Sequence, residues 1–261
     1  MHLPLIVALI IKSLFWLLAF AVLVRLAARR IGVVDANARR LLGAVALGAL
    51  AGSKVVYLLG YPDLIDFSPV EASERLLAWI GGDSAVGGLL GGYIALWLVE
   101  RSERRERLAD ALAAPIASAL LVLSLGTFFW GLRGNGYGSP TSMPWGMNFG
   151  DGAMRHPVML YEAAFLGAVV WLGRHRVFDA WQRGPARQFV AAYCAFNLVI
   201  GFLKPPFGTP LLREALEPPV RLYAELLTIE QWLCAVALGV VLRAWARAAK
   251  PAKEVPGREA G

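Results

Sequence analysis

The sequence is poor in charged side chains and in residues that cross-link chains or bind metals. Only 17% of its 261 residues are charged and 57% are apolar, with a mean hydropathy of +0.55, which excludes a soluble domain of ordinary composition. Its two cysteines, Cys194 and Cys234, lie inside apolar runs, so we expect neither a disulfide framework nor a metal site. No internal repeat of the kind found in many transporters is present. These absences favour an all-α polytopic membrane protein without a cofactor.

Apolar runs of suitable length predict about seven transmembrane helices. They cover residues 4–24, 41–60, 84–99, 111–129, 158–173, 189–203 and 228–247. The first run has no basic segment before it, since its first cation is Lys12, so it is interpreted as a helix and not as a cleaved signal peptide. We expect one membrane-embedded domain over residues 1–248 and a short disordered cytoplasmic tail over 249–261.

The basic residues are distributed unevenly between alternate loops. Of the 26 Lys and Arg, 18 lie in segments 25–40, 100–110, 174–187 and 243–261, whereas segments 61–83, 130–157 and 204–227 hold six. This asymmetry predicts that the N-terminus is outside and the C-terminus cytoplasmic. The net charge of +7 is thereby attributed to orientation in the membrane, and no nucleic-acid partner is expected.

One outer segment, residues 126–162, is unusually rich in glycine and proline. The closely spaced glycines after Gly131 are incompatible with a regular helix. Exposed amides of glycines such as Gly138, beside Arg133 and Asn135, would suit a phosphate. The alternative is an ordinary interfacial loop in which Trp130 and Trp145 belong to the aromatic belt.

The motif Arg155-His156-Pro157 precedes the fifth run. Pro157 suits the first turn of a helix, which would set His156 near a helix N-terminus that favours an anion. Tyr161 and Glu162 follow one turn later, and an acid at that depth needs a cationic partner. His156 is the candidate proton carrier, although an isolated interfacial histidine also has structural uses.

Three lysines and a group of glycines complete the set of candidates. Lys12, Lys54 and Lys204 place positive charge toward the outer half of the membrane, where an anionic lipid headgroup is the natural partner. Snorkelling to the outer surface is the other interpretation. Gly87 and Gly88 open the third run, where small residues allow either close approach of two helices or contact with a ligand.

Several of these segments together resemble one enzyme family. The segments are Tyr137-Gly138-Ser139-Pro140-Thr141, Met143-Pro144-Trp145-Gly146, Arg155-His156-Pro157, Leu160-Tyr161-Glu162 and, more weakly, Leu227-Thr228-Ile229-Glu230-Gln231-Trp232. In order and spacing they are similar to the phosphatidylglycerol–prolipoprotein diacylglyceryl transferases of the bacterial inner membrane, and the resemblance extends from about Leu41 to Val241.

The resemblance implies a reaction and a set of site residues. The family transfers a diacylglyceryl group from phosphatidylglycerol to the lipobox cysteine thiol of a prolipoprotein signal peptide and releases glycerol phosphate. Its implied partners here are phosphatidylglycerol, or a related anionic phospholipid, and that signal peptide. The implied catalytic residues are Arg133, His156 and Tyr161. The implied lipid or phosphate ligands are Lys54, Gly87, Gly88, Asn135, Gly138, Arg155, Glu162 and Lys204, and no metal is implied.

The sequence also departs from the family pattern. A family histidine is replaced by Val86, which cannot carry a proton, and the family's arginine-asparagine block aligns either with Thr127 and Trp130 or, with a deletion, with Arg133 and Asn135. Two family arginines become Lys54 and Lys204, and a family tyrosine becomes Lys12. A lysine keeps the charge but not the bidentate geometry. The alternatives are therefore a paralogue that uses another lipid or acceptor, a lipid-binding protein without activity, and a small lipid transporter or flippase.

Overall fold

The computed structural model describes residues 5–31, 36–60, 82–100, 102–131, 136–175, 184–204, 221–222 and 227–248. Within these ranges the chain forms seven long helices: α1 (Leu5–Ile31), α2 (Ala36–Gly60), α4 (Ala85–Val99), α5 (Ser102–Trp130), α6 (Val158–Arg174), α7 (Pro185–Ile200) and α8 (Ile229–Ala248). Two short antiparallel pairs join β1 (Met147–Asn148) to β2 (Met154–Arg155) and β3 (Arg221–Leu222) to β4 (Leu227–Thr228). The predicted helical fold is confirmed, and the predicted tail 249–261 lies outside the described residues.

Four of the helices are long and apolar enough to cross a membrane: Ile6–Ile31, Arg40–Gly60, Arg104–Trp130 and Ile229–Arg247. The helices α4, α6 and α7 have 15, 17 and 16 residues. Large apolar side chains on the outside of the bundle, such as Leu17, Leu98 and Val240, are more than half exposed, as expected of surfaces that face lipid and not water. The protein is a multi-pass membrane protein.

Two helices extend furthest beyond the apolar runs that predicted them. α1 continues to Ile31 and α5 begins at Ser102, although the runs cover 4–24 and 111–129. The additional turns contain arginine, glutamate and alanine, which favour a helix in water as well as in lipid. Hydropathy marks the apolar part of a helix and not its ends.

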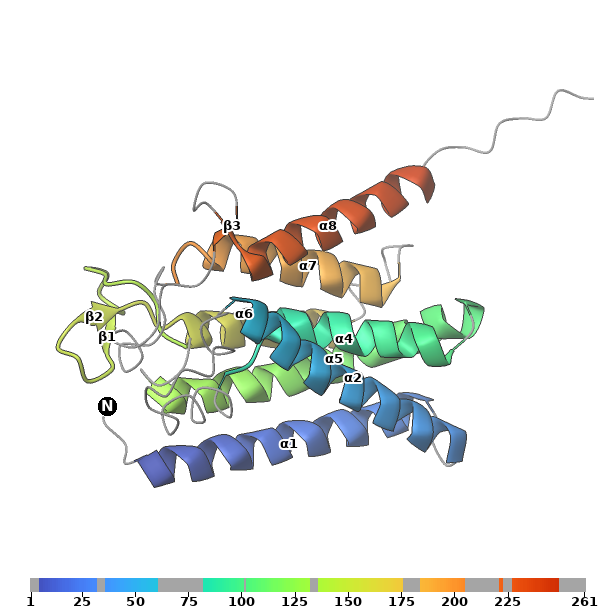
Figure 1. The fold of residues 1–261 in the computed structure, drawn as a ribbon, viewed down its shortest axis with the longest axis horizontal. Coiled ribbons are helices and arrows are strands. Elements are labelled where there is room, and N and C mark those ends of the chain that lie inside the picture. The colour runs from blue at the N-terminus through green and yellow to red at the C-terminus, as the bar shows by residue number, and fades with distance from the viewer. Residues whose placement is uncertain are drawn as a thin grey trace, which may run out of the picture.

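The helices pack in pairs, with α2 against α4 and α1 against α5, while α5 also contacts α6 and α7, and α7 contacts α8 (Figure 1). Glycines form the α2–α4 contact: a Cβ atom on Gly52 would lie 2.7 Å from the Cα of Gly91, and one on Gly87 would meet the carbonyl oxygen of Gly52. Small residues let two helix backbones approach closely. The expectation that the glycines of the third run serve close helix approach is confirmed.

Seven helix ends gather at one end of the bundle (Figure 1). These are the first residues of α1, α4, α6 and α8 and the last residues of α2, α5 and α7. The β1–β2 hairpin lies at the same end. Residues 136–157 form turns, bends and this hairpin, so the prediction that the glycine-rich segment is not a regular helix is confirmed for these residues. Almost all the polar residues considered below lie at this end.

The buried core lies between α4, α5, α6, α7 and α8. It contains Val86, Leu166, Tyr193 and the two cysteines, Cys194 and Cys234, which are both free thiols. Val86 packs in this apolar cluster.

Candidate functional site

His156 and Tyr161 form a hydrogen-bonded pair at the start of α6. The distance between His156 Nδ1 and the Tyr161 hydroxyl is 3.1 Å. Pro157 is the N-cap residue of α6, one position before the helical turn in which it was expected, because its ψ of 71° is not helical. His156 therefore precedes the helix, and Tyr161, one turn in, reaches back to it. The pair can share and transfer a proton.

Gly138 packs closely between His156 and Leu203, which follows α7 in the chain. Its N–H donates to the His156 carbonyl oxygen at 2.7 Å, and the next N–H, of Ser139, donates to the Leu203 carbonyl oxygen at 2.7 Å. A Cβ atom on Gly138 would lie 2.6 Å from His156 Cβ and 2.9 Å from the Leu203 carbonyl oxygen, so only glycine fits. Because Leu203 precedes Lys204, this contact fixes the histidine relative to that lysine.

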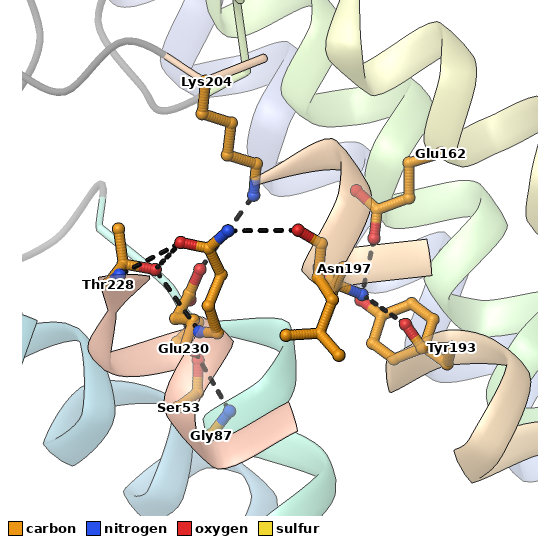
Figure 2. Close-up of polar contacts among 11 residues, drawn as sticks. Ser53, Gly87, Glu162, Tyr193, Asn197, Lys204, Thr228 and Glu230 are labelled. Atoms are coloured by element: carbon orange, nitrogen blue, oxygen red, sulfur yellow. Dashed lines mark hydrogen bonds and ion pairs between the residues drawn. The ribbon is translucent and has the colours of Figure 1, made fainter. Parts of the chain in front are cut away.

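Glu162 and Lys204 belong to a second polar group beside this pair, which Figure 2 shows in close-up. The Tyr193 hydroxyl donates to Glu162 Oε1 at 2.8 Å inside the bundle. Lys204 Nζ lies 4.0 Å from Glu230 Oε2. Lys204 and Glu230 are also close enough for their charges to act on Glu162. Among the described residues, the carboxylate within ion-pair distance of Lys204 is that of Glu230, whereas Glu162 has the Tyr193 hydroxyl as a hydrogen-bond partner.

Gln231 ties the start of α8 to α7. Its Oε1 accepts from the Thr228 amide at 3.0 Å, and its Nε2 donates to the Leu198 carbonyl oxygen at 3.0 Å. Asn197 donates to the Tyr193 carbonyl oxygen at 2.9 Å. These bonds satisfy buried polar groups within the apolar interior, and they hold the helices that carry Lys204 and Glu230.

The side chain of Arg155 contacts other residues of the loop in which it lies. Its Nε donates to Asp151 Oδ2 at 2.7 Å, and its guanidinium lies 5.3 Å from the centre of the Tyr137 ring. Partial burial acts to raise the pKa of the Asp151 carboxyl, but hydrogen bonds from Arg155 and the Ala153 amide and the charge of Arg155 outweigh it, so this pKa lies below its ordinary value. The contacts of Arg155 order the loop that carries Gly138.

The other two lysines lie in a separate group. Lys12 Nζ is 3.2 Å from Asp83 Oδ2, and Lys54 Nζ is 3.1 Å from Asp83 Oδ1. Lys12 is only 8% exposed, so snorkelling to the surface does not describe it. Lys54 also donates to the Gly82 carbonyl oxygen at 2.5 Å.

Of the residues that the sequence analysis selected, the structure brings together His156, Tyr161, Gly138, Arg155, Glu162 and Lys204. Lys54 joins Lys12 and Asp83 instead. The Gly87 amide donates to the Ser84 side chain at 3.0 Å, capping α4, and Gly88 faces Ala49 and Ser53 on α2. Arg133 and Asn135 lie outside the described residues. Among the residues that the structure does describe, no cluster of three or more His, Cys, Asp or Glu is suited to a metal.

Asp83, Tyr193 and Glu230 were not among the site residues predicted from the sequence. Two signals could have found them. Tyr193 and Asn197 are polar residues four positions apart in an apolar run, which places them on one helix face. Asp83 directly precedes one apolar run, and Glu230 lies in the first turn of the last helix, where an acid needs a cation nearby.

Comparison of the sequence with known proteins identifies the family of this chain. The sequence profile of the prolipoprotein diacylglyceryl transferase family matches residues 7–246. The chain belongs to the prolipoprotein diacylglyceryl transferase family. A phosphatidylglycerol–prolipoprotein diacylglyceryl transferase of Nitratidesulfovibrio vulgaris is 36% identical over 169 residues, which cover 61% of this chain and 60% of that relative.

Relatives of the same name in the genus Cupriavidus match more of their length. The protein of Cupriavidus pinatubonensis is 30% identical over 82% of this chain and 76% of its own length. That of Cupriavidus metallidurans is 29% identical over 77% of this chain and 72% of its own. The transferase family match thus includes all the helices that carry the polar groups described above.

Proposed function

We propose that the protein transfers the diacylglyceryl group of phosphatidylglycerol to the cysteine thiol of a prolipoprotein lipobox. The observation that carries this proposal is the family match over residues 7–246. The His156–Tyr161 pair beside the Lys204 group supplies chemistry suited to the reaction.

In the proposed reaction, the cysteine sulfur attacks the glycerol carbon that bears the phosphate. A carbon–sulfur bond forms, the carbon–oxygen bond to the phosphate breaks, and glycerol phosphate leaves with the bonding electrons. The thiol must lose its proton to become a nucleophile. We assign acceptance of that proton to His156, which the Tyr161 hydroxyl orients through its 3.1 Å hydrogen bond.

The leaving phosphate gains negative charge, which positioned cations and N–H groups stabilise. We assign this role to Arg133 and Lys204. Glu230 lies 4.0 Å from the Lys204 ammonium group and holds it just beyond the end of α7. Arg155 instead orders the loop of Gly138, since Asp151, Tyr137 and the Gly138 carbonyl oxygen surround its guanidinium.

We further propose seven membrane spans in a bacterial inner membrane, with the N-terminus outside, the C-terminus cytoplasmic and one membrane domain over residues 1–248. The helix ends that carry the polar groups lie together at one end of the bundle (Figure 1), and this arrangement and the excess of Lys and Arg in the alternate loops support it. A green fluorescent protein fused to the C-terminus is expected to fluoresce, because its chromophore matures in the cytoplasm; a dark fusion would contradict this orientation.

One observation favours a second function, binding of the lipid without transfer. Val86 is buried among Tyr193, Cys194 and Cys234, so the position of a family histidine carries no proton acceptor. If His156 does not take over the role of that family histidine, the protein binds phosphatidylglycerol but does not transfer its diacylglyceryl group.

The deciding experiment incubates the purified protein with radiolabelled phosphatidylglycerol and a lipobox peptide, and scores thioether-linked lipid. The family reaction predicts a labelled peptide and release of glycerol phosphate. A His156→Gln variant tests the assigned proton acceptor, and Arg187→Gln is its control, since Arg187 pairs with Glu106 near the starts of α7 and α5, the helix ends opposite to the polar end (Figure 1). Lipid that binds but never reaches the peptide contradicts the transferase proposal and leaves the binding function.

A further inference from the structure

The β1–β2 hairpin and the turn before it expose large apolar side chains outside the helices. The chain has five methionines, and three of them, Met143, Met147 and Met154, are exposed here. Trp145, in the turn, is 57% exposed. Figure 1 shows the hairpin beyond the ends of α5 and α6, so these side chains do not belong to the sides of the helices that face lipid.

Contacts with the bundle and within the loop order this hairpin. Phe149, which directly follows β1, is buried, and its ring lies 6.0 Å from the Phe128 ring near the end of α5. Asn148 Oδ1 accepts hydrogen bonds from the amides of Gly150 and Gly152, at 2.7 Å and 3.3 Å. An apolar surface that is already ordered loses less conformational entropy when a partner binds to it.

Met154 shares one face of the hairpin with His156, the proposed proton acceptor. The N–H of Thr141 donates to the Met154 carbonyl oxygen at 2.8 Å, and the N–H of His156 donates to the Ser139 carbonyl oxygen at 3.2 Å. The chain that contains Met154 is therefore paired as far as His156. In paired extended chains, side chains two positions apart point to the same face and are about 6.6 Å apart. Met154 thus lies beside His156.

The turn that carries Trp145 meets the same face. The N–H of Gly146 closes this turn by donating to the Met143 carbonyl oxygen at 2.9 Å. A Cβ atom on Gly146 would lie 3.4 Å from Met154 Cβ, so the turn packs next to Met154. An apolar surface therefore extends from the turn to the proposed proton acceptor.

This surface presents little charge to a partner. Between residues 136 and 156 the charged side chains are those of Asp151 and Arg155, which pair with each other at 2.7 Å. A partner therefore gains more from apolar contact than from ionic contact. Methionine side chains are flexible and polarisable, and such surfaces accept partners of differing sequence. Tryptophan adds a large anchor of the kind that dominates binding at interfaces.

We propose that Met143, Trp145 and Met154 form a docking surface for the apolar segment of the acceptor polypeptide, an assignment that rests on the proposed function. A secretory signal peptide carries an apolar segment of about 7–15 residues before its processing site. The acceptor thiol must come within hydrogen-bond reach of His156, so the polypeptide that carries it passes beside Met154. The headgroup layer of the bilayer is the other possible occupant, but it does not explain why the surface ends at His156.

The test measures binding of an acceptor peptide to the full-length protein in a maltoside detergent. The fluorescent peptide contains a lipobox and its apolar segment, with serine in place of the cysteine so that no transfer occurs. Fluorescence anisotropy gives the Kd. Trp145→Ala is expected to raise Kd at least about tenfold, as expected for an aromatic anchor. Met154→Gln, which keeps the length of the side chain, is expected to raise it about three- to tenfold.

Two further variants are matched controls. Met147→Gln changes an exposed methionine of the same hairpin, but Met147 is paired with Arg155 and so lies on the face opposite to Met154. Trp97→Ala removes a tryptophan that is also 57% exposed but lies near the last residue of α4, away from the hairpin. Both should leave Kd within about twofold.

The inference is overturned if the wild type does not bind the peptide, or if Met147→Gln weakens binding as much as Met154→Gln does. It is also overturned if Trp145→Ala and Met154→Gln leave Kd unchanged, as expected for a surface that contacts the bilayer. A peptide whose apolar segment is replaced by serines must bind at least about tenfold more weakly; equal binding contradicts apolar docking.

The transfer assay with the cysteine peptide is independent of these measurements. The expected pattern of Kd values without thioether product contradicts the proposed reaction only. Product formation with Kd values unchanged by Trp145→Ala and Met154→Gln contradicts the docking surface only.

Discussion

Replacing Gly138 with alanine tests whether close packing positions His156. The new Cβ atom would lie 2.6 Å from His156 Cβ and 2.9 Å from the carbonyl oxygens of His156 and Leu203. An ordinary contact at 3.4 Å therefore needs about 0.8 Å of movement against His156. Overpacking of this kind costs about 1–3 kcal/mol of unfolding free energy, and a misplacement near 1 Å costs about 100-fold in rate.

We therefore expect Gly138→Ala to lower kcat/KM for lipid transfer about ten- to 100-fold. Its unfolding temperature in detergent should fall as well, because the oxygens that the methyl group meets belong to the backbone and cannot rotate away. Gly167→Ala on α6 is the matched control, since nothing lies within 4 Å of its new Cβ. The reasoning is refuted if Gly138→Ala transfers lipid at the wild-type rate and unfolds at the wild-type temperature.

Three further outcomes follow from the contacts. Tyr161→Phe removes the hydroxyl that orients the neighbouring histidine and should lower kcat about tenfold, with an unchanged unfolding temperature; equal kcat contradicts the proton pair. Gly91→Ala sets a methyl group against the α2 backbone and should cost about 1–3 kcal/mol of stability, whereas Gly43→Ala, with nothing within 4 Å, should not destabilise. Finally, because folding lowers the pKa of Asp151, its pair with Arg155 stabilises the protein above the unfolded-state pKa of about 3.9, and this contribution is lost as the pH falls through the lower folded pKa. The stability difference between wild type and Asp151→Asn should therefore shrink in acid, and a difference constant from pH 7 to 3 contradicts the assignment.

Hydropathy was sufficient to locate each of the helices that the structure describes, because a chain in lipid must satisfy its backbone inside each segment. Hydropathy did not locate the end of α1 or the start of α5, because residues with high helix propensity continue beyond the apolar run. The contact between His156 and Tyr161 could also be predicted from the sequence, because the two residues are five positions apart and meet at the start of a single helix. By contrast, the carboxylate partners of the lysines are distant in sequence: Asp83 is 71 positions from Lys12.

The sequence by itself determined the class of protein, its family resemblance and the end of the bundle at which the polar residues collect. These follow from composition, periodicity and local motifs. Tertiary structure alone decided how the cations are distributed, with Lys54 beside Lys12 and Asp83, and Lys204 beside Glu230. Salt bridges between helices depend on which helix faces pack together, and glycine contacts such as Gly52 on Gly91 fix that packing. The pattern along a single helix does not contain that information.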